Sequence, residues 1–118
     1  MVASSDTWEY GKSLSHMQTL VYECNVEHGW FDEDRGVGMD IALIHSEVSE
    51  MLEAYRRHGI EGYTDDTGKP DDFNSEVADV LIRLLDTCQR YNINLEREFN
   101  RKLRYNMTRP YRHGNKKA

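Results

Sequence analysis

Proline and cysteine are both scarce in this chain of 118 residues, with two of each. Pro70 and Pro110 fall where helical patterns break. Cys24 and Cys88 are far apart and form no Cys-x-x-Cys pair, which excludes a zinc ribbon and a dithiol redox motif. Each cysteine lies within a helical apolar pattern, so we expect two buried free thiols in a reducing compartment.

Long apolar runs are also missing. No stretch of the sequence approaches the ~20 apolar residues that a membrane-spanning helix needs. The first six residues are small and polar, without the basic and apolar regions of a secretion signal. We therefore expect a soluble, cytoplasmic protein that has no membrane partner.

Positive charge is concentrated at the C-terminal end. Residues 97–118 carry eight Lys or Arg and one acid, so this segment is +7, and residues 1–96 are −13. Duplex binding needs a broad basic face, so we expect no nucleic-acid partner. An acidic body suits bound cations, and a basic tail suits phosphates. A solvated tail without a specific role fits the same charge pattern.

Apolar residues recur at helical spacing in four stretches, and no stretch alternates as a strand does. These stretches predict helices at about residues 7–27, 39–58, 71–91 and 95–106. We expect a single all-α domain over residues 1–118, built as a four-helix bundle, with a basic tail from about residue 107. Only 38% of the residues are hydrophobic, so we expect part of the core to lie between subunits of an oligomer.

Two pairs of acids lie one turn apart on the second and third predicted helices. Glu47 and Glu50 border the apolar stripe of the second helix, and Glu76 and Asp79 border that of the third. Glu53 lies further round, toward solvent. Burying unpaired charge is costly, so four inward-facing carboxylates require protonation, Lys or Arg partners, or a metal ion.

The ligand set indicates which metal would bind. Carboxylate oxygens favour a hard cation such as Mg²⁺ or Mn²⁺, and the chain has no Glu-x-x-His motif of di-iron bundles. Such a cation can bridge phosphate oxygens and activate water, with one carboxylate as general base. Arg83 and Asp86 continue the same polar stripe. Ordinary surface acids on amphipathic helices are the alternative interpretation.

A family resemblance follows from these residues. The pattern Glu47-x-x-Glu50, then 25 residues, then Glu76-x-x-Asp79 resembles the ExxE…ExxD motif of the MazG-like all-α NTP pyrophosphatases. LIHSEVSEMLEAYR and SEVADVLIRLLD resemble the two metal helices of that family. The resemblance implies that the four acids bind Mg²⁺ and catalyse hydrolysis of a nucleoside triphosphate substrate to the monophosphate and pyrophosphate.

The resemblance also implies a homodimer or homotetramer. It covers about residues 14–114. Many members of the family carry a further Glu directly before the first motif. Ser46 stands at that position here, which leaves the number of bound metal ions open.

Candidate substrate contacts lie at both ends of the chain. The segment KLRYNMTRPYRHG resembles the C-terminal segment of MazG-like proteins, and in it Lys102, Asn106 and Arg109 are candidates for phosphate or sugar contacts. For the base, Asn25 can present both a donor and an acceptor, and Trp30 can stack on a ring. Structural or subunit contacts are the alternative roles for these residues.

Two rival functions remain open. A phosphoribosyl-ATP pyrophosphohydrolase would use the same metal site on a different substrate. A non-catalytic helical assembly module would carry the acids as surface charge and would dock a partner through the basic tail. The sequence does not predict which base or sugar is preferred.

Overall fold

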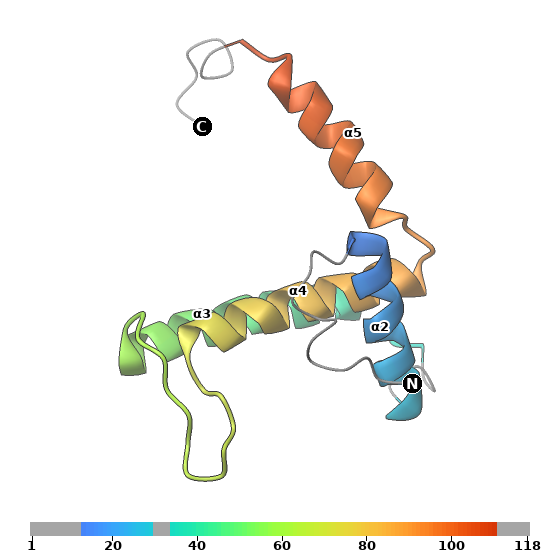
Figure 1. Cartoon of the computed structure of the whole chain (residues 1–118). Coiled ribbons are helices and arrows are strands. Elements are labelled where there is room, and N and C mark those ends of the chain that lie inside the picture. The colour runs from blue at the N-terminus through green and yellow to red at the C-terminus, as the bar shows by residue number, and fades with distance from the viewer. Residues whose placement is uncertain (1–12, 30–33, 111–118) are drawn as a thin grey trace.

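The computed structural model describes residues 13–29 and 34–110. Their secondary structure consists of four helices, which are α2 (Leu14–Glu27), α3 (Val37–His58), α4 (Phe73–Arg90) and α5 (Leu95–Met107) (Figure 1). No strand occurs in the described residues, where an isolated bridge joins Thr64 to Pro70. The all-α prediction is confirmed. None of the described helices combines the length and apolar character needed to cross a bilayer.

The first predicted helix differs from α2 at its start. It was expected to run unbroken from about residue 7, but Ser13 is extended, with φ −66° and ψ 159°, and α2 begins at Leu14. The Ser13 hydroxyl accepts a hydrogen bond from the His16 backbone N–H at 3.1 Å, which caps the helix. The part of the prediction before residue 13 lies outside the described residues.

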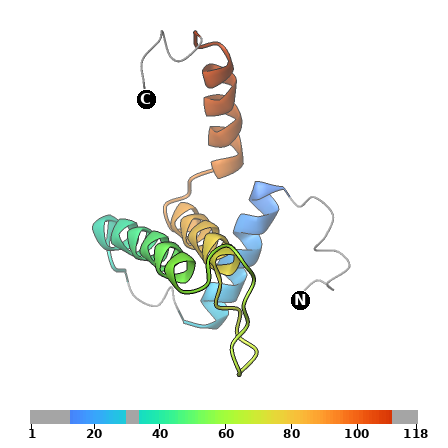
Figure 2. The same cartoon turned by 90° about the vertical axis from the view of Figure 1, so that its left-hand side faces the viewer.

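Helices α3 and α4 form an antiparallel hairpin, joined by the loop at residues 59–72 (Figures 1 and 2). The Asp72 carboxylate accepts a hydrogen bond from the Ser75 backbone N–H at 2.8 Å, and the Ser75 hydroxyl accepts one from the Asp72 N–H at 3.2 Å. This capping box defines where α4 begins. Asp72 also accepts a bond from the Tyr63 N–H at 2.9 Å, so the same carboxylate ties the loop to the helix.

Helix α2 crosses one end of the α3–α4 hairpin, whereas α5 projects away from it (Figures 1 and 2). The turn between α4 and α5 is pinned by Gln18 of α2. The Gln18 amide nitrogen donates to the Gln89 side chain at 2.8 Å and to the Ile93 carbonyl at 3.0 Å. In the described residues, therefore, three helices pack together and the fourth extends outward, unlike the compact four-helix bundle expected from the sequence.

The interior among the three packed helices is unusually polar. Its buried residues are Gln18, Asn25, Asp40, Glu76 and Asp86, beside Ala54, Leu85 and Cys88. Asp40, Glu47 and Ala54 recur every seven residues on α3, and this face meets α4. Much of the apolar stripe predicted for α3 therefore lies beside this contact face and not within it. Leu52, for example, is 48% exposed.

The cysteines also differ from the prediction. Cys88 is buried as expected, but Cys24 is exposed. Helix α2 buries Gln18 and Asn25, which are seven residues apart and share the face toward α4. Cys24 lies off this face, and its thiol is 3.8 Å from Nδ1 of His28, one turn further along α2.

Candidate metal centre

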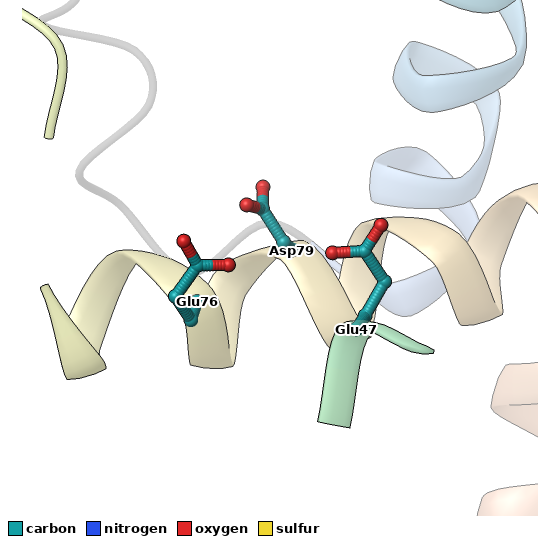
Figure 3. Close-up of side chains that lie close together, drawn as sticks. All are labelled: Glu47, Glu76 and Asp79. Carbon is teal, nitrogen blue, oxygen red and sulfur yellow. The ribbon is translucent and has the colours of Figure 1, made fainter. Parts of the chain in front are cut away.

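Three carboxylates converge where α3 and α4 lie side by side. Glu47 comes from α3, and Glu76 and Asp79 come from α4 (Figure 3). One oxygen atom from each lies within 4.8 Å of the others. Glu76 is the deepest of them at 9% exposure, Glu47 is partly buried and Asp79 lies at the surface. We call these three residues the acidic triad.

Local geometry explains the convergence. Glu76 and Asp79 are three residues apart and so occupy one face of α4. Glu47 lies on the α3 face that meets α4, because it is one heptad after buried Asp40 and one before buried Ala54. Glu53 is exposed, as expected, and pairs with Arg56 at 3.0 Å.

Glu50 occupies a different place from its three predicted companions. It is exposed, and it is not part of the acidic triad. Its charge nevertheless acts on Glu76. The structure thus places Glu50 beside the triad, toward solvent.

Negative charge is concentrated at Glu76. Burial is the largest cause that raises the pKa of this carboxyl above its ordinary value near 4.5. The charge of Asp79 and a hydrogen bond with it raise the pKa further, followed by the charges of Glu50 and Glu47. A cation at this point would relieve that repulsion. Three convergent carboxylate oxygens, one of them buried, fit a hard cation such as Mg²⁺ or Mn²⁺.

A cavity of about 210 Å³ adjoins the triad. Its walls are Asn25 from α2, Glu47 from α3, and Asp79, Ile82, Arg83 and Asp86 from α4. Arg83 donates to Glu47 across the helix pair at 3.2 Å, and each of these two side chains is 20% exposed. The cavity is therefore lined by two members of the triad, Glu47 and Asp79, and by polar side chains from three helices.

A hydrogen-bonded network supports that wall. The Asn25 amide nitrogen donates to Asp86 at 2.7 Å, and both residues are buried. The other Asp86 oxygen is 3.3 Å from Arg90 and 3.7 Å from Arg35. Asn25, a predicted base contact, is thus held at the cavity wall by a carboxylate that two guanidinium groups neutralise.

The network continues to Asp40, which the sequence analysis missed. Asp40 is 1% exposed, accepts a bond from Arg35 at 3.0 Å and accepts another from the Tyr91 hydroxyl. Burial alone would raise the pKa of Asp40, but these hydrogen bonds and the charges of Arg35 and Arg90 lower it. Asp40 precedes Glu47 by seven residues and so shares its face of α3. This spacing could have predicted that Asp40 is buried between the helices.

The remaining predicted substrate residues are not brought to this cavity. Lys102 and Asn106 lie on α5, which projects away, and Arg109 follows its end. Lys102 and Arg109 instead lie over the Tyr105 ring, at 5.2 and 5.8 Å from its centroid. Trp30 lies outside the described residues, as does the basic tail from residue 111.

Comparisons of the chain with protein-family models, with curated proteins and with solved structures found no match in any of the three. The resemblance to MazG-like proteins therefore stays a prediction, which depends on the two acidic helices and the C-terminal segment of the sequence.

Proposed function

We propose that this protein is a Mg²⁺-dependent nucleoside triphosphate pyrophosphohydrolase of the MazG-like all-α type. The observation that carries the proposal is the acidic triad of Glu47, Glu76 and Asp79, which meets from two helices beside a cavity. The repulsion concentrated at buried Glu76 supports a cation there. Phosphate chemistry is the natural use of a hard cation held by carboxylates.

In this mechanism the triad would hold the metal, with Glu50 at its solvent side. Bound Mg²⁺ would supply charge neutralisation on the phosphates and would acidify water. The overall reaction adds water to a phosphorus of the substrate and breaks the bond from this phosphorus to the pyrophosphate leaving group. Glu50 is the carboxylate best placed to accept the proton, because it is near Glu76 but outside the triad. Asn25 and the cavity wall would orient the nucleoside.

We further propose that the protein works as a homodimer or homotetramer. The sides of α3 and α4 expose apolar residues at helical spacing, including Val48, Leu52, Val77 and Leu81. Large apolar side chains exposed on neighbouring helices are typical of protein interfaces. Helix α5 projects away from the helices that carry its own acidic triad, so in this proposal its cations would meet substrate phosphates at the triad of a second copy.

The test is a pyrophosphate-release assay over canonical and damaged nucleotides with Mg²⁺, including phosphoribosyl-ATP. We expect Glu76→Gln and Glu50→Gln to lower turnover by at least about 100-fold. Glu53→Gln is the matched control, because Glu53 is on the same helix as Glu50 but pairs with Arg56 at the surface. Turnover of phosphoribosyl-ATP, and of no other nucleotide, would indicate the rival pyrophosphohydrolase activity. Absence of turnover on every nucleotide, together with absence of any Mg²⁺ dependence, would indicate an assembly module.

A further inference from the structure

Arg83 is a cation inside an otherwise acidic site. It follows Asp79 by one helical turn on α4, and it reaches across to Glu47 of α3 at 3.2 Å. Its side chain also forms part of the cavity wall beside the triad. The guanidinium therefore touches a predicted metal ligand and faces the space where a nucleotide would bind.

We propose that Arg83 is a built-in counter-cation that holds Glu47 when no metal is bound, and that it exchanges this carboxylate for a phosphate of the substrate. This inference rests on the proposed function, because it assigns Arg83 a role at the same site. Glu47 then has two alternative partners, the Arg83 guanidinium and the metal ion. The phosphate takes the place of Glu47 as the anion paired with Arg83.

Competition for Glu47 is the first step of the argument. Glu47 is the member of the triad that Arg83 contacts, whereas the repulsion is centred on Glu76. A metal ion that takes an oxygen from Glu47 must weaken the ion pair with Arg83. By thermodynamic linkage, the factor by which the ion pair with Arg83 stabilises the metal-free state equals the factor by which it lowers metal affinity. Arg83 thus limits metal binding when substrate is absent.

The second step concerns the position of the released guanidinium. Its neighbour Asp86 already has Asn25, Arg90 and Arg35 around it, at 2.7 to 3.7 Å. Asp86 therefore already has an amide donor and two guanidinium groups besides Arg83. An incoming triphosphate would bring new negative charge into the same cavity, and guanidinium groups bind phosphate oxygens through paired hydrogen bonds.

The experiment uses two binding measurements on full-length protein, neither of which requires turnover. Mn²⁺ alone is titrated into metal-free wild type, Arg83→Gln and Arg83→Lys. Inorganic pyrophosphate is then titrated at saturating Mn²⁺. Arg56→Gln is the matched control, since Arg56 also pairs with a glutamate of α3, but at the exposed surface.

We expect opposite shifts in the two titrations. Arg83→Gln should bind Mn²⁺ about three- to tenfold more tightly, because the competing ion pair is gone. It should bind pyrophosphate about tenfold more weakly, because a phosphate donor is gone. Arg83→Lys should lie between Arg83→Gln and wild type, and Arg56→Gln should match wild type in both titrations.

An unchanged or weaker Mn²⁺ affinity in Arg83→Gln overturns the counter-cation role. If the ion pair were purely structural, its loss could leave the Mn²⁺ site unchanged or damage it, but could not raise its affinity. Unchanged pyrophosphate affinity overturns the exchange to phosphate. Failure of the proposed function is a separate outcome, namely wild type that binds Mn²⁺ but releases no pyrophosphate from any nucleotide.

Discussion

At the scale of single residues, two buried carboxylates of the α3–α4 hairpin have opposite electrostatic surroundings. Glu76 has acidic neighbours and a pKa raised by burial and by their charges. Asp40 has Arg35 and Tyr91, and its pKa is lowered. The two carboxylates lie in the same hairpin, but one is poised for a cation and the other is already neutralised. They should respond in opposite ways to pH and to substitution.

Glu76→Gln should stabilise the metal-free protein at pH 7. The raised pKa of Glu76 means that its contribution to stability is fully present below the ordinary value near 4.5 and is lost as pH rises through the folded-state pKa. The variant should therefore melt a few degrees above wild type at neutral pH, and this advantage should vanish below about pH 4.5. Adding Mg²⁺ should reverse the order at pH 7, because only wild type retains the full triad.

Thermal melts across pH, with EDTA or with Mg²⁺, measure this effect. Glu53→Gln provides the control and should show neither the pH-dependent gain nor the reversal. A Glu76→Gln variant less stable than wild type in EDTA at pH 7 would contradict the concentration of repulsion at Glu76.

Asp40→Asn should destabilise the protein by about 2–3 kcal/mol, because it removes the nearer of the two carboxylates beside the partly buried Arg35 guanidinium. The lowered pKa of Asp40 contributes stability above its ordinary value near 3.8, and that contribution is lost as pH falls through the folded-state pKa. Urea denaturation at pH 7 measures the difference. Asp66→Asn, in the exposed loop, should stay within about 0.5 kcal/mol of wild type.

At the scale of elements, the starts of α2 and α4 have a local cause, but the direction of α5 has a tertiary one. Ser13 and Asp72 cap α2 and α4 with their side chains. The turn after α4 instead relies on Gln18, which comes from a different helix. The outward direction of α5 therefore depends on the docking of α2.

Gln18→Ala should release that turn. The substitution removes two hydrogen bonds from a buried amide, at a cost of about 1–2 kcal/mol, and leaves α5 free to sample other directions. Distances between spin labels on α2 and α5 should become broader, and the amides of residues 91–94 should exchange faster. Thr19→Ala, the neighbouring position, removes only a bond to the Ser15 carbonyl and should leave the distance distribution narrow.

At the scale of the whole molecule, polar and apolar surfaces are distributed in an unusual way. The faces of α2, α3 and α4 that meet one another carry Gln18, Asn25, Asp40, Glu76 and Asp86. Many of the large apolar side chains lie on the outside, on α3, α4 and α5. Since apolar burial is the main driving force of folding and association, this arrangement favours assembly of several copies.

Leu52→Glu should weaken self-association. Leu52 is 48% exposed on α3, beside the polar face that meets α4. A charge placed in an apolar interface loses burial and adds desolvation cost, so the dissociation constant should rise at least about tenfold. Sedimentation of wild type and variant over a range of concentrations tests this. Ile60→Glu, a more exposed apolar residue in the loop, should sediment like wild type.

Helical periodicity was sufficient to predict several features of the protein. The spacing of apolar residues located α3, α4 and α5 to within two residues at each end, and it located the end but not the start of α2. The three-residue spacing placed Glu76 and Asp79 on one face, and the position of Glu53 relative to the apolar stripe placed it toward solvent, because such relations lie within a single helix. Glu50 is exposed and lies outside the triad, and its role at the site stays a prediction.

Periodicity did not show which stripe of each helix faces its neighbours. An amphipathic helix has two distinct faces, and the apolar one was expected inside. Asp40 can be buried because Arg35 and Tyr91 bond to it. Asn25 of α2 and Asp86 of α4 can be buried because they bond to each other, with Arg90 beside Asp86. Those partners come together only when three helices are docked, so the polar interior, the outward path of α5 and the Arg83–Glu47 pair follow from tertiary packing.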